Sequence, residues 1–433
     1  MSGNKCVLAY SGGLDTSAML PWLCERGYEV HAVLVDVGQE EDLNALCDKA
    51  MNYGAASAVV RDAKPAMLAH AVPLAIGLAA TYEGCYRLGT ALARPFIALE
   101  QVRVARQLGG ATLAHGATGK GNDQVRFEFA YRSLAPECPV LAPWKTWEFG
   151  GRTDLINYLR SRGCTDDYAV QKDYSLDENL WHLSIEGGPL EDATAFVDAD
   201  EIMAKMADRF GGAKSGGAGP SQVDVTYEQG VPVALNGERL PLADIVSRLN
   251  TTYRHASWAW DVVIENRYTG IKSRGIYINP AATLLQTGAD DLARTCLNKP
   301  SYDRYVQLGA EYGAMLYRGE YFSDQREILE TTGRALMAHL NGTVTLHLKP
   351  RVYSARILAE RPLFRKDIAT FEKSHDYSHA DAEGFIRLSW LLTIGRTSRE
   401  NGYADALETG FGVGSGLCGD QPVSEGGLVS SSA

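Results

Sequence analysis

The pattern of apolar and polar positions divides the chain into an alternating first part and a mixed second part. Up to about residue 165, short apolar runs alternate with longer segments in which apolar residues recur at helical spacing. Such alternation is typical of a doubly wound α/β arrangement, a parallel sheet covered by helices on both faces. The expected strands are 6–10, 30–35, 57–61, 112–115 and 139–142, and the expected helices are 15–26, 41–52 and 92–108.

The second part should be mixed α/β, because its pattern predicts hairpins as well as helices. Apolar runs flank turn residues at two places, which predicts the strand pairs 223–227 with 231–235 and 344–348 with 352–357. Helical spacing predicts helices at 301–319 and 325–340, followed by a late amphipathic helix at 380–399.

Two segments are too rich in small residues to pack a core. Residues 211–220 are expected to form a loop or linker, and residues 410–433 a loose tail. We therefore expect a doubly wound parallel-sheet domain over 1–165, a mixed α/β domain over 166–365, and a C-terminal helical arm with its tail over 366–433.

Composition and charge narrow the function toward small ligands. The chain has 45% hydrophobic and 22% charged residues, an ordinary balance for a soluble globular protein. Its formal net charge of −11 opposes binding to nucleic acid and to anionic membranes, so we expect neither as a partner. No apolar stretch approaches about 20 residues and no basic leader opens the sequence, which predicts a cytoplasmic protein. The eight cysteines are scattered, which predicts reduced, mostly buried thiols and no metal site.

The most informative segment joins the first strand to the first helix through adjacent glycines: Ala9-Tyr10-Ser11-Gly12-Gly13-Leu14-Asp15-Thr16-Ser17. Two glycines let backbone N–H groups close around a phosphate, and the helix N-terminus adds a favourable dipole. The hydroxyls of Ser11, Thr16 and Ser17 add further donors. No Walker lysine follows, which excludes kinase and GTPase sites. The alternative is a turn that merely connects strand and helix, but such a turn has no use for the hydroxyls and Asp15.

This Ser-Gly-Gly-x-Asp-Thr pattern after a first strand resembles the pyrophosphate-binding loop of the N-type ATP pyrophosphatases. The resemblance implies an adenine nucleotide alpha hydrolase-like fold and cleavage of ATP to AMP and pyrophosphate. The tRNA thiolases and the asparagine, GMP and NAD synthetases share this module. The loop therefore indicates the ATP chemistry and leaves the acceptor open.

Longer runs indicate the acceptor, because they resemble the argininosuccinate synthetases. The main run is Gly116-Ala117-Thr118-Gly119-Lys120-Gly121-Asn122-Asp123-Gln124-Val125-Arg126-Phe127-Glu128, and shorter runs lie at 175–181, 186–188, 265–267 and 272–277. The resemblance covers about residues 5–280 in register and continues loosely to about residue 400. It implies a carbon–nitrogen ligase of arginine biosynthesis that condenses citrulline and aspartate to argininosuccinate through citrullyl-AMP. It also implies ATP with Mg²⁺ as cosubstrate, no protein-bound metal or organic cofactor, and a homotetramer.

The same resemblance assigns the ligand-binding residues. For ATP it implies contacts from Ala9, Tyr10, Ser11, Gly12, Gly13, Leu14, Asp15, Thr16, Ser17, Val35 and Gly116. For aspartate it implies contacts from Thr118, Asn122 and Asp123. For citrulline it implies contacts from Tyr86, Ala91, Asn122, Arg126, Ser175, Ser184, Glu265 and Tyr277. No catalytic residue is assigned, because the sequence indicates no general base for the aspartate amine.

The chemistry of these residue types suits two amino-acid substrates. Asp123 can accept a hydrogen bond from an amine, Arg126 can pair with a carboxylate, and Glu265 is a natural partner for an α-ammonium group. Taken singly, several have simpler interpretations: Asp123 could cap a helix, Arg126 could be solvated, and Tyr86 and Tyr277 could be core residues. Their joint occurrence in matched runs favours ligand contact. His115, at a strand end, is interpreted as structural.

The chain departs from the family pattern beside the expected ureido-acid site. Ile278-Asn279-Pro280-Ala281-Ala282-Thr283 stands where the family usually has Glu-Thr-Pro, a small residue, Gly and Thr. A carboxylate is thereby lost, and Ala282 lacks the φ freedom of glycine. Ala91 stands where some members have serine. These changes leave open the alternative that the same ligase chemistry acts on another ureido or amide acid in specialised metabolism.

Two further alternatives are less favoured by the sequence. A tRNA sulfur-transfer enzyme would need paired cysteines and a basic RNA-binding surface, and the chain offers neither pattern. A non-catalytic sensor of amino acids or ATP would not need the intact loop from Ser11 to Ser17.

Overall fold

The computed structural model describes residues 4–118, 121–164, 174–206, 219–349, 352–364, 383–386 and 388–389. The chain separates into two compact units, Met1–Phe364 and Arg365–Ala433, and the fold below is that of the first unit. The late helix expected at 380–399 is described only at 383–386 and 388–389, where it is helical. Of the linker expected at 211–220, residues 211–218 lie outside the described residues, as does the tail expected at 410–433. The domain boundary expected at residue 165 stays a prediction.

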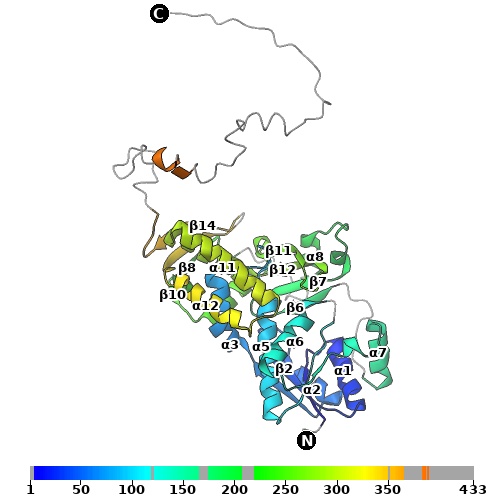
Figure 1. Cartoon of the computed structure of the whole chain (residues 1–433). Helices are drawn as coiled ribbons and strands as arrows, with labels where there is room; N and C mark the ends of the chain where they lie inside the picture. Colours follow the sequence, from blue (N-terminus) through cyan, green and yellow to red (C-terminus); the bar gives the residue numbers. More distant parts are fainter. Residues whose placement is uncertain are drawn as a thin grey trace, which may run out of the picture. The chain divides into compact units, whose positions relative to one another are not determined.

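A five-stranded parallel sheet forms the first half of this unit, as expected (Figure 1). Its spatial order is β3-β2-β1-β4-β5, with β1 at Lys5–Ala9, β2 at Glu29–Asp36, β3 at Ser57–Asp62, β4 at Thr112–Ala114 and β5 at Val140–Leu141. The accompanying helices are α1 (Leu14–Glu25), α2 (Leu43–Asn52), α3 (Lys64–His70), α4 (Val72–Gly77), α5 (Gly89–Gln107), α6 (Asn122–Leu134) and α7 (Arg152–Ser161), with a 3₁₀ turn at Pro143–Lys145.

Helices cover both faces of this sheet because successive strand residues point to opposite sides. Val7 of β1 and Val33 of β2 pack in the apolar cluster that contains α3, α4 and α5. Cys6 and Leu8 of β1 pack instead with α1, α2 and α7. The doubly wound arrangement expected from the alternating pattern is therefore confirmed.

The strand order reverses between β1 and β4, and this reversal places the first candidate site. From β1 the chain moves outward to β2 and β3, and it then returns to add β4 and β5 on the other side of β1. In open parallel sheets, ligands bind at such a switch point, outside the carboxyl ends of the strands. The loop Ser11 to Gly13 follows β1 and Gly116 follows β4, so both lie at this edge.

The second half contains two antiparallel sheets. The first has the order β10-β9-β8-β13-β14 and contains both expected hairpins: β8 (Gln222–Glu228), β9 (Val231–Leu235), β10 (Glu238–Arg239), β13 (Gly342–His347) and β14 (Tyr353–Ala359). The second, in the order β11-β12-β7-β6, was not predicted: β6 (Ser175–Glu178), β7 (Leu183–Glu186), β11 (Trp260–Asn266) and β12 (Lys272–Ile278). The helices are α8 (Ala199–Met206), α9 (Leu242–Tyr253), α10 (Pro280–Cys296), α11 (Lys299–Tyr317) and α12 (Asp324–Met337), with 3₁₀ turns at Gly188–Glu191 and Ser257–Ala259.

Helix α11 packs directly against the chain that follows α4, and two glycines permit the close approach. A Cβ on Gly309 would lie 2.4 Å from the Leu78 carbonyl oxygen, and one on Gly313 would lie 2.2 Å from that of Thr81. This contact places the end of α11 beside the loop that leads to Tyr86. A segment late in the sequence thereby reaches the site formed by the first half.

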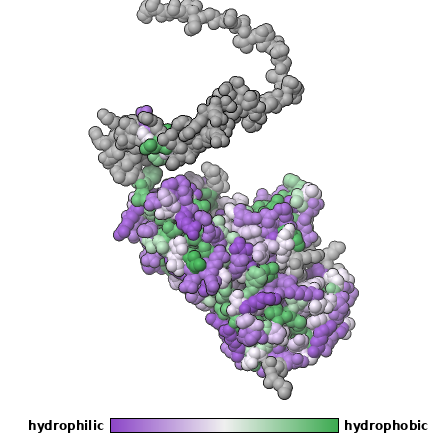
Figure 2. Space-filling view, viewed as in Figure 1, coloured by the Kyte–Doolittle hydropathy of each residue, from purple (hydrophilic) through white to green (hydrophobic). Residues whose placement is uncertain are grey.

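The face seen in Figure 2 is largely hydrophilic, with smaller apolar patches between charged side chains. Among the described residues, no helix is both long and apolar enough to cross a membrane. Of the cysteines in the described residues, Cys6 and Cys296 are buried, Cys85 is exposed and the others are intermediate. The expectation of mostly buried thiols is therefore wrong.

Candidate functional site

The loop after β1 has the shape of an anion cradle. Gly12 has φ +71°, and a Cβ there would lie 2.4 Å from a Leu46 methyl carbon. The Thr16 hydroxyl donates to the Gly13 carbonyl at 3.3 Å and accepts from the Ser11 N–H at 3.3 Å. Gly13 is the N-cap of α1 and supplies no side-chain acceptor. The first-turn N–H groups of α1 therefore have no capping side chain, as an anion site requires.

A cation from α2 reaches this loop, and sequence reasoning missed it. The Lys49 ammonium group donates to the Gly12 carbonyl at 3.0 Å. Lys49 lies far from the Ser-Gly-Gly motif in sequence, so no local spacing indicates that it reaches the loop. Its positive charge adds to the positive end of the α1 dipole, so both would attract an anion in the cradle.

The loop after β4 is fixed by a buried histidine and packs on α1. A Cβ on Gly116 would lie 2.9 Å from the Thr16 methyl carbon. The His115 ring is fully buried, its Nδ1 accepts from the Ala117 N–H at 3.2 Å, and its Nε2 lies 3.8 Å from Glu128. His115 and then Lys145 lower the pKa of Glu128 to about 2. These contacts support the structural interpretation of His115.

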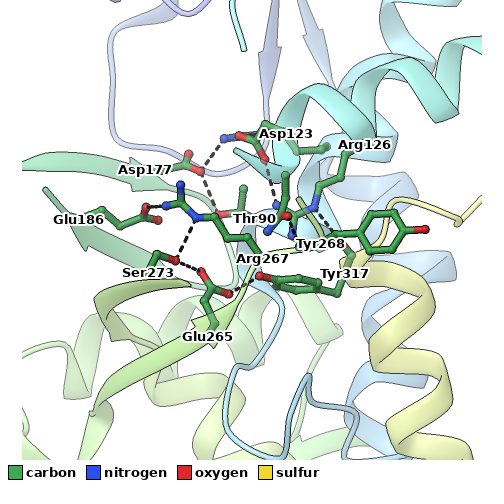
Figure 3. Close-up of polar contacts among 12 residues, drawn as sticks. Thr90, Asp123, Arg126, Asp177, Glu186, Glu265, Arg267, Tyr268, Ser273 and Tyr317 are labelled. Carbon is green, nitrogen blue, oxygen red and sulfur yellow. Dashed lines mark hydrogen bonds and ion pairs between the residues drawn. The ribbon is translucent and has the colours of Figure 1, made fainter. Parts of the chain in front are cut away.

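A partly buried network of arginines and carboxylates lies at the N-termini of α5 and α6 (Figure 3). Arg94 Nε lies 2.9 Å from Asp123 Oδ2, and Arg94 Nη2 lies 2.6 Å from Asp177 Oδ2. Arg126 Nη1 lies 2.9 Å from Asp123 Oδ1, and its Nε donates to the Tyr317 carbonyl at 3.0 Å. Burial alone would raise the pKa of Asp123, but Arg94 and Arg126 hold it below its ordinary value.

The simpler interpretations of two residues are wrong. Helix α6 begins at Asn122 with Gly121 as N-cap and no side-chain capping bond, so Asp123 is not a cap. The Asp123 carboxylate is instead shared by two guanidinium groups. Arg126 is only 4% exposed, so it is not a solvated helix arginine. Both side chains belong to the same ion-pair network.

Glu265 is the second charged centre of the site (Figure 3). It is 5% exposed and accepts hydrogen bonds from the hydroxyls of Tyr277 at 3.1 Å, Tyr317 at 2.8 Å and Ser273 at 3.2 Å. Within the described part of the chain it makes no ion pair. The Tyr86 ring packs edge-on against Tyr277 at 4.9 Å, and burial raises the pKa of Tyr86. A buried carboxylate with three neutral donors is prepared for a cation.

Arg267 connects Glu265 to a second carboxylate. Its Nε donates to the Ser273 hydroxyl at 2.9 Å, and its Nη2 donates to Glu186 at 3.0 Å. Burial raises the pKa of Glu186 to about 7, against the opposing charge of Arg267, and the nearby Glu265 adds to this effect. The Glu186 carboxyl group therefore titrates near neutral pH.

The remaining expected residues differ in their partners and in their burial. Asn122 Oδ1 accepts from the Tyr268 N–H at 2.8 Å, and the Ser184 hydroxyl donates to the Asp177 carbonyl at 3.4 Å. Ser175 is exposed and pairs across the strands with Glu186. The other expected residues range from fully buried (Ala91) through nearly buried (Leu14, Val35) to exposed (Thr118).

Several residues of the network were not assigned from the sequence: Thr90, Arg94, Asp177, His182, Ser273 and Tyr317. Asp177 and Ser273 lie inside the matched runs but were given no role. Arg94 carried a usable signal, since it is the lone charge in an otherwise uncharged stretch of α5 from Gly89 to Ala98. Such a charge is expected to be paired when buried. Tyr317 has no local signal.

The departures at 278–282 fall at the end of β12 and at the start of α10. Ile278 is 3% exposed and belongs to the cluster of Leu183 and Ile276, whereas Tyr277 packs on the opposite side with Tyr86. Asn279 donates to Asp261 at 3.0 Å and accepts from Thr283 at 2.7 Å. Ala282 lies within α10 and is not among the residues with positive φ. The Ile278 side chain therefore lies on the side of β12 opposite Tyr277, whereas Ala282 shares an apolar cluster with Tyr86 and Tyr277, and the expectation that these changes border the ureido-acid site stays a prediction.

The parallel sheet, its switch-point loop and the adjacent charged centres define an α/β nucleotide-binding enzyme of the ATP pyrophosphatase type. The family model described as the arginosuccinate synthase N-terminal HUP domain matches residues 5–165. The model for the arginosuccinate synthase C-terminal domain matches residues 174–394. The chain belongs to the argininosuccinate synthase family, whose members are ATP-dependent ligases that join citrulline and aspartate in arginine biosynthesis.

Individual relatives match along almost their whole length. The argininosuccinate synthase of Caldicellulosiruptor saccharolyticus is 37% identical, over 94% of this chain and 100% of that protein. The enzyme of Carboxydothermus hydrogenoformans is 40% identical, over 90% of this chain and 96% of its own length. That of Nitratidesulfovibrio vulgaris is 40% identical, over 92% and 98%.

Proposed function

We propose that this chain adenylates the ureido oxygen of citrulline and then transfers the activated carbon to the amine of aspartate. The observation that carries the proposal is Glu265, a buried carboxylate with three hydroxyl donors and, among the described residues, no ion-pair partner. The α-ammonium group of citrulline would supply the missing positive charge. Arg126 would pair with the citrulline carboxylate, and Tyr86, Ala91, Asn122, Ser175, Ser184 and Tyr277 would complete the subsite.

ATP would bind at the switch point, with its pyrophosphate in the loop from Ala9 to Ser17 and its remaining contacts at Val35 and Gly116. The N–H groups at the start of α1 and the ammonium group of Lys49 face the same loop, so they would neutralise the leaving group. Mg²⁺ would enter as the complex with ATP.

Aspartate would bind at Thr118, Asn122 and Asp123. The amine must lose a proton before it can attack, and the surroundings of Asp123 favour that loss. Arg94 and Arg126 both contact the Asp123 carboxylate and neutralise its charge, with Asp177 also paired to Arg94, so Asp123 would hold an ammonium group less strongly than an unpaired carboxylate would. Nearby cations lower the pKa of an amine. Asp123 would then accept a hydrogen bond from the neutral amine. No residue is proposed as the general base.

The reaction balances in two displacements. The ureido oxygen attacks the α-phosphorus, the bond from that phosphorus to the bridging oxygen breaks, and pyrophosphate leaves. The aspartate nitrogen then attacks the ureido carbon, the bond from this carbon to the AMP oxygen breaks, and AMP leaves with loss of a proton from nitrogen. Because the protein would form no covalent bond, positioning would supply most of the acceleration, up to about 7–11 kcal/mol.

The direct test is to incubate the protein with MgATP, aspartate and citrulline and to identify the products by mass. Argininosuccinate, AMP and pyrophosphate are the expected products. If the protein turns over another ureido acid but not citrulline, the acceptor assignment is wrong and the ligase chemistry stands.

We further propose the three-domain division at residues 165 and 365, a homotetramer and a cytoplasmic location. Light scattering of the purified protein tests the tetramer.

A further inference from the structure

The turn between β6 and β7 contacts three other segments of the chain through three consecutive residues, Leu180, Trp181 and His182. It is closed by Asn179, whose N–H donates to the His182 carbonyl at 3.0 Å and whose Oδ1 accepts from the Trp181 N–H at 2.9 Å. The Leu180 N–H donates to the Val37 carbonyl at 2.7 Å, in the loop after β2. The Trp181 indole N–H donates to the Arg87 carbonyl at 2.8 Å. His182 is the third of these residues and points at the start of α5.

His182 packs directly against Gly89, where any side chain would clash with its ring. It is 5% exposed, and a Cβ on Gly89 would lie 2.0 Å from its ring. The ring stacks on Tyr277 with 5.7 Å between centroids and 5° between planes. Its Nε2 lies 3.1 Å from the Thr90 hydroxyl, and that hydroxyl lies 3.0 Å from Asp177 Oδ2.

The hydrogen bonds fix where His182 carries its proton. A carboxylate only accepts hydrogen bonds, so the single hydroxyl hydrogen of Thr90 must point at Asp177. The Thr90 oxygen is then an acceptor toward His182, and Nε2 must hold the hydrogen. Burial keeps the ring neutral. A neutral His182 with its hydrogen on Nε2 is the one form that satisfies both contacts without adding a charge.

One side chain therefore supports both halves of the site. Through Thr90 it orients Asp177, which holds Arg94, which in turn holds Asp123 of the aspartate half. Through ring stacking it supports Tyr277, whose hydroxyl donates to Glu265 of the citrulline half. We propose that His182 is a positioning residue of the ligase reaction, acting through the Thr90 hydroxyl on one substrate subsite and through its ring on the other. This inference rests on the function proposed above.

Two substitutions of His182 separate its two contacts. His182→Phe keeps a flat ring against Tyr277 and removes the donor, so the KM for aspartate should rise about tenfold or more while the KM for citrulline changes less than about threefold. His182→Gln keeps a terminal N–H donor and removes the ring, so the pattern should reverse. Thr90→Val should reproduce the effect of His182→Phe, and the double variant should be no worse than Thr90→Val alone.

A matched control is His31→Gln. His31 lies near the start of β2, is also buried, and forms a hydrogen bond with the hydroxyl of Ser57. It should leave both KM values unchanged. Equal losses for both substrates in all His182 variants, in proportion to the fall in Tm, would overturn the proposal and make His182 a core residue. Additive effects of His182→Phe and Thr90→Val would overturn it as well.

A second readout does not depend on activity. Nitrogen NMR of protein labelled at histidine, with the His182 signal assigned by its loss in His182→Gln, should show the hydrogen on Nε2 at neutral pH. A hydrogen on Nδ1 would overturn the proposal. If the unmodified protein makes no argininosuccinate from citrulline, the proposed function fails instead, and the NMR result still decides the hydrogen-bonding arrangement.

Discussion

Tyr317 and Glu265 lie 52 residues apart in sequence and meet through a hydrogen bond of 2.8 Å from the phenol to Oε2. The Tyr317 ring also stacks on Tyr82, with centroids 3.5 Å apart, and its backbone carbonyl accepts from Arg126. One residue at the end of α11 therefore touches the loop before Tyr86, the network of Asp123 and the Glu265 centre. The end of α11 therefore packs against Glu265, which is 5% exposed.

Glu265→Gln should raise the KM for citrulline at least tenfold, about 1.4 kcal/mol or more, because the ammonium group would lose a buried charged partner. The affinity for ATP, measured separately, should stay near normal. Tyr317→Phe is the matched control: it removes one of three donors to the carboxylate and should have a smaller effect on the same KM. An unchanged citrulline KM in Glu265→Gln would contradict the assignment.

Asp123→Ala should weaken the use of aspartate and leave ATP binding near normal. The substitution removes the acceptor for the amine. It also removes the carboxylate that both Arg94 and Arg126 contact. Loss of a charged hydrogen-bond partner costs about 1.5–3 kcal/mol, so the aspartate KM should rise by about tenfold to a hundredfold. Initial rates at varied aspartate and saturating MgATP and citrulline measure it. An equal loss of ATP affinity would mean that Asp123 has a general structural role.

The parts of the fold and site that could be predicted are those with a local cause. The strand and helix expected around Gly12 and Gly13 are observed as Lys5–Ala9 and Leu14–Glu25, because two glycines and adjacent hydroxyls suit only a tight strand-to-helix turn. Asp123 and Arg126 lie together because they are one helical turn apart. Both features can be predicted from the spacing of residues in the sequence alone.

The missed parts depend on contacts between distant segments. Tyr317 reaches Glu265 because Gly309 and Gly313 let α11 lie on the backbone at 78–81, and no spacing in the sequence indicates that approach. The sequence predicts Ile278 beside the site because this residue directly follows Tyr277. Neighbouring residues of a strand point to opposite faces, so its side chain lies in another apolar cluster.

The nucleotide products should be AMP and pyrophosphate, because the cradle at Ser11 to Ser17 would hold the leaving group and contains no Walker lysine. With ¹⁸O in the ureido group of citrulline, the label should appear in AMP, since that oxygen would form the bond to the α-phosphorus. Mass spectrometry of the AMP decides the question. Unlabelled AMP, or ADP with phosphate, would exclude the adenylate route.

Ile278→Glu, which restores the residue usual in the family, should destabilise this chain more than it alters catalysis. Ile278 is 3% exposed in the cluster with Leu183 and Ile276, so the new carboxylate would be buried without a described cation beside it. Such burial costs several kcal/mol. The Tm should fall by several degrees, while kcat/KM for citrulline changes tenfold or less. Ile278→Val, which removes one methylene, should cost only about 0.5–1.5 kcal/mol. A large change in citrulline kcat/KM at unchanged Tm would place residue 278 in the site after all.

The unfolding free energy should depend on pH through His182. Burial lowers the pKa of this histidine to about 4, whereas in the unfolded chain it titrates near its ordinary value of about 6.5. Between pH 6.5 and pH 4, His182 is protonated in the unfolded chain and neutral in the folded protein. The contribution of His182 to the unfolding free energy is therefore fully present above about pH 6.5 and is lost as the pH falls toward 4. The loss should reach about 3 kcal/mol at pH 4 relative to His182→Gln, which has no group to titrate. Urea unfolding of both proteins at pH 7, 6, 5 and 4 measures the difference. The sign follows from burial of the neutral ring between Tyr277 and Gly89: a difference that stays constant with pH would mean that the ring accepts a proton in the folded protein as readily as in the unfolded chain.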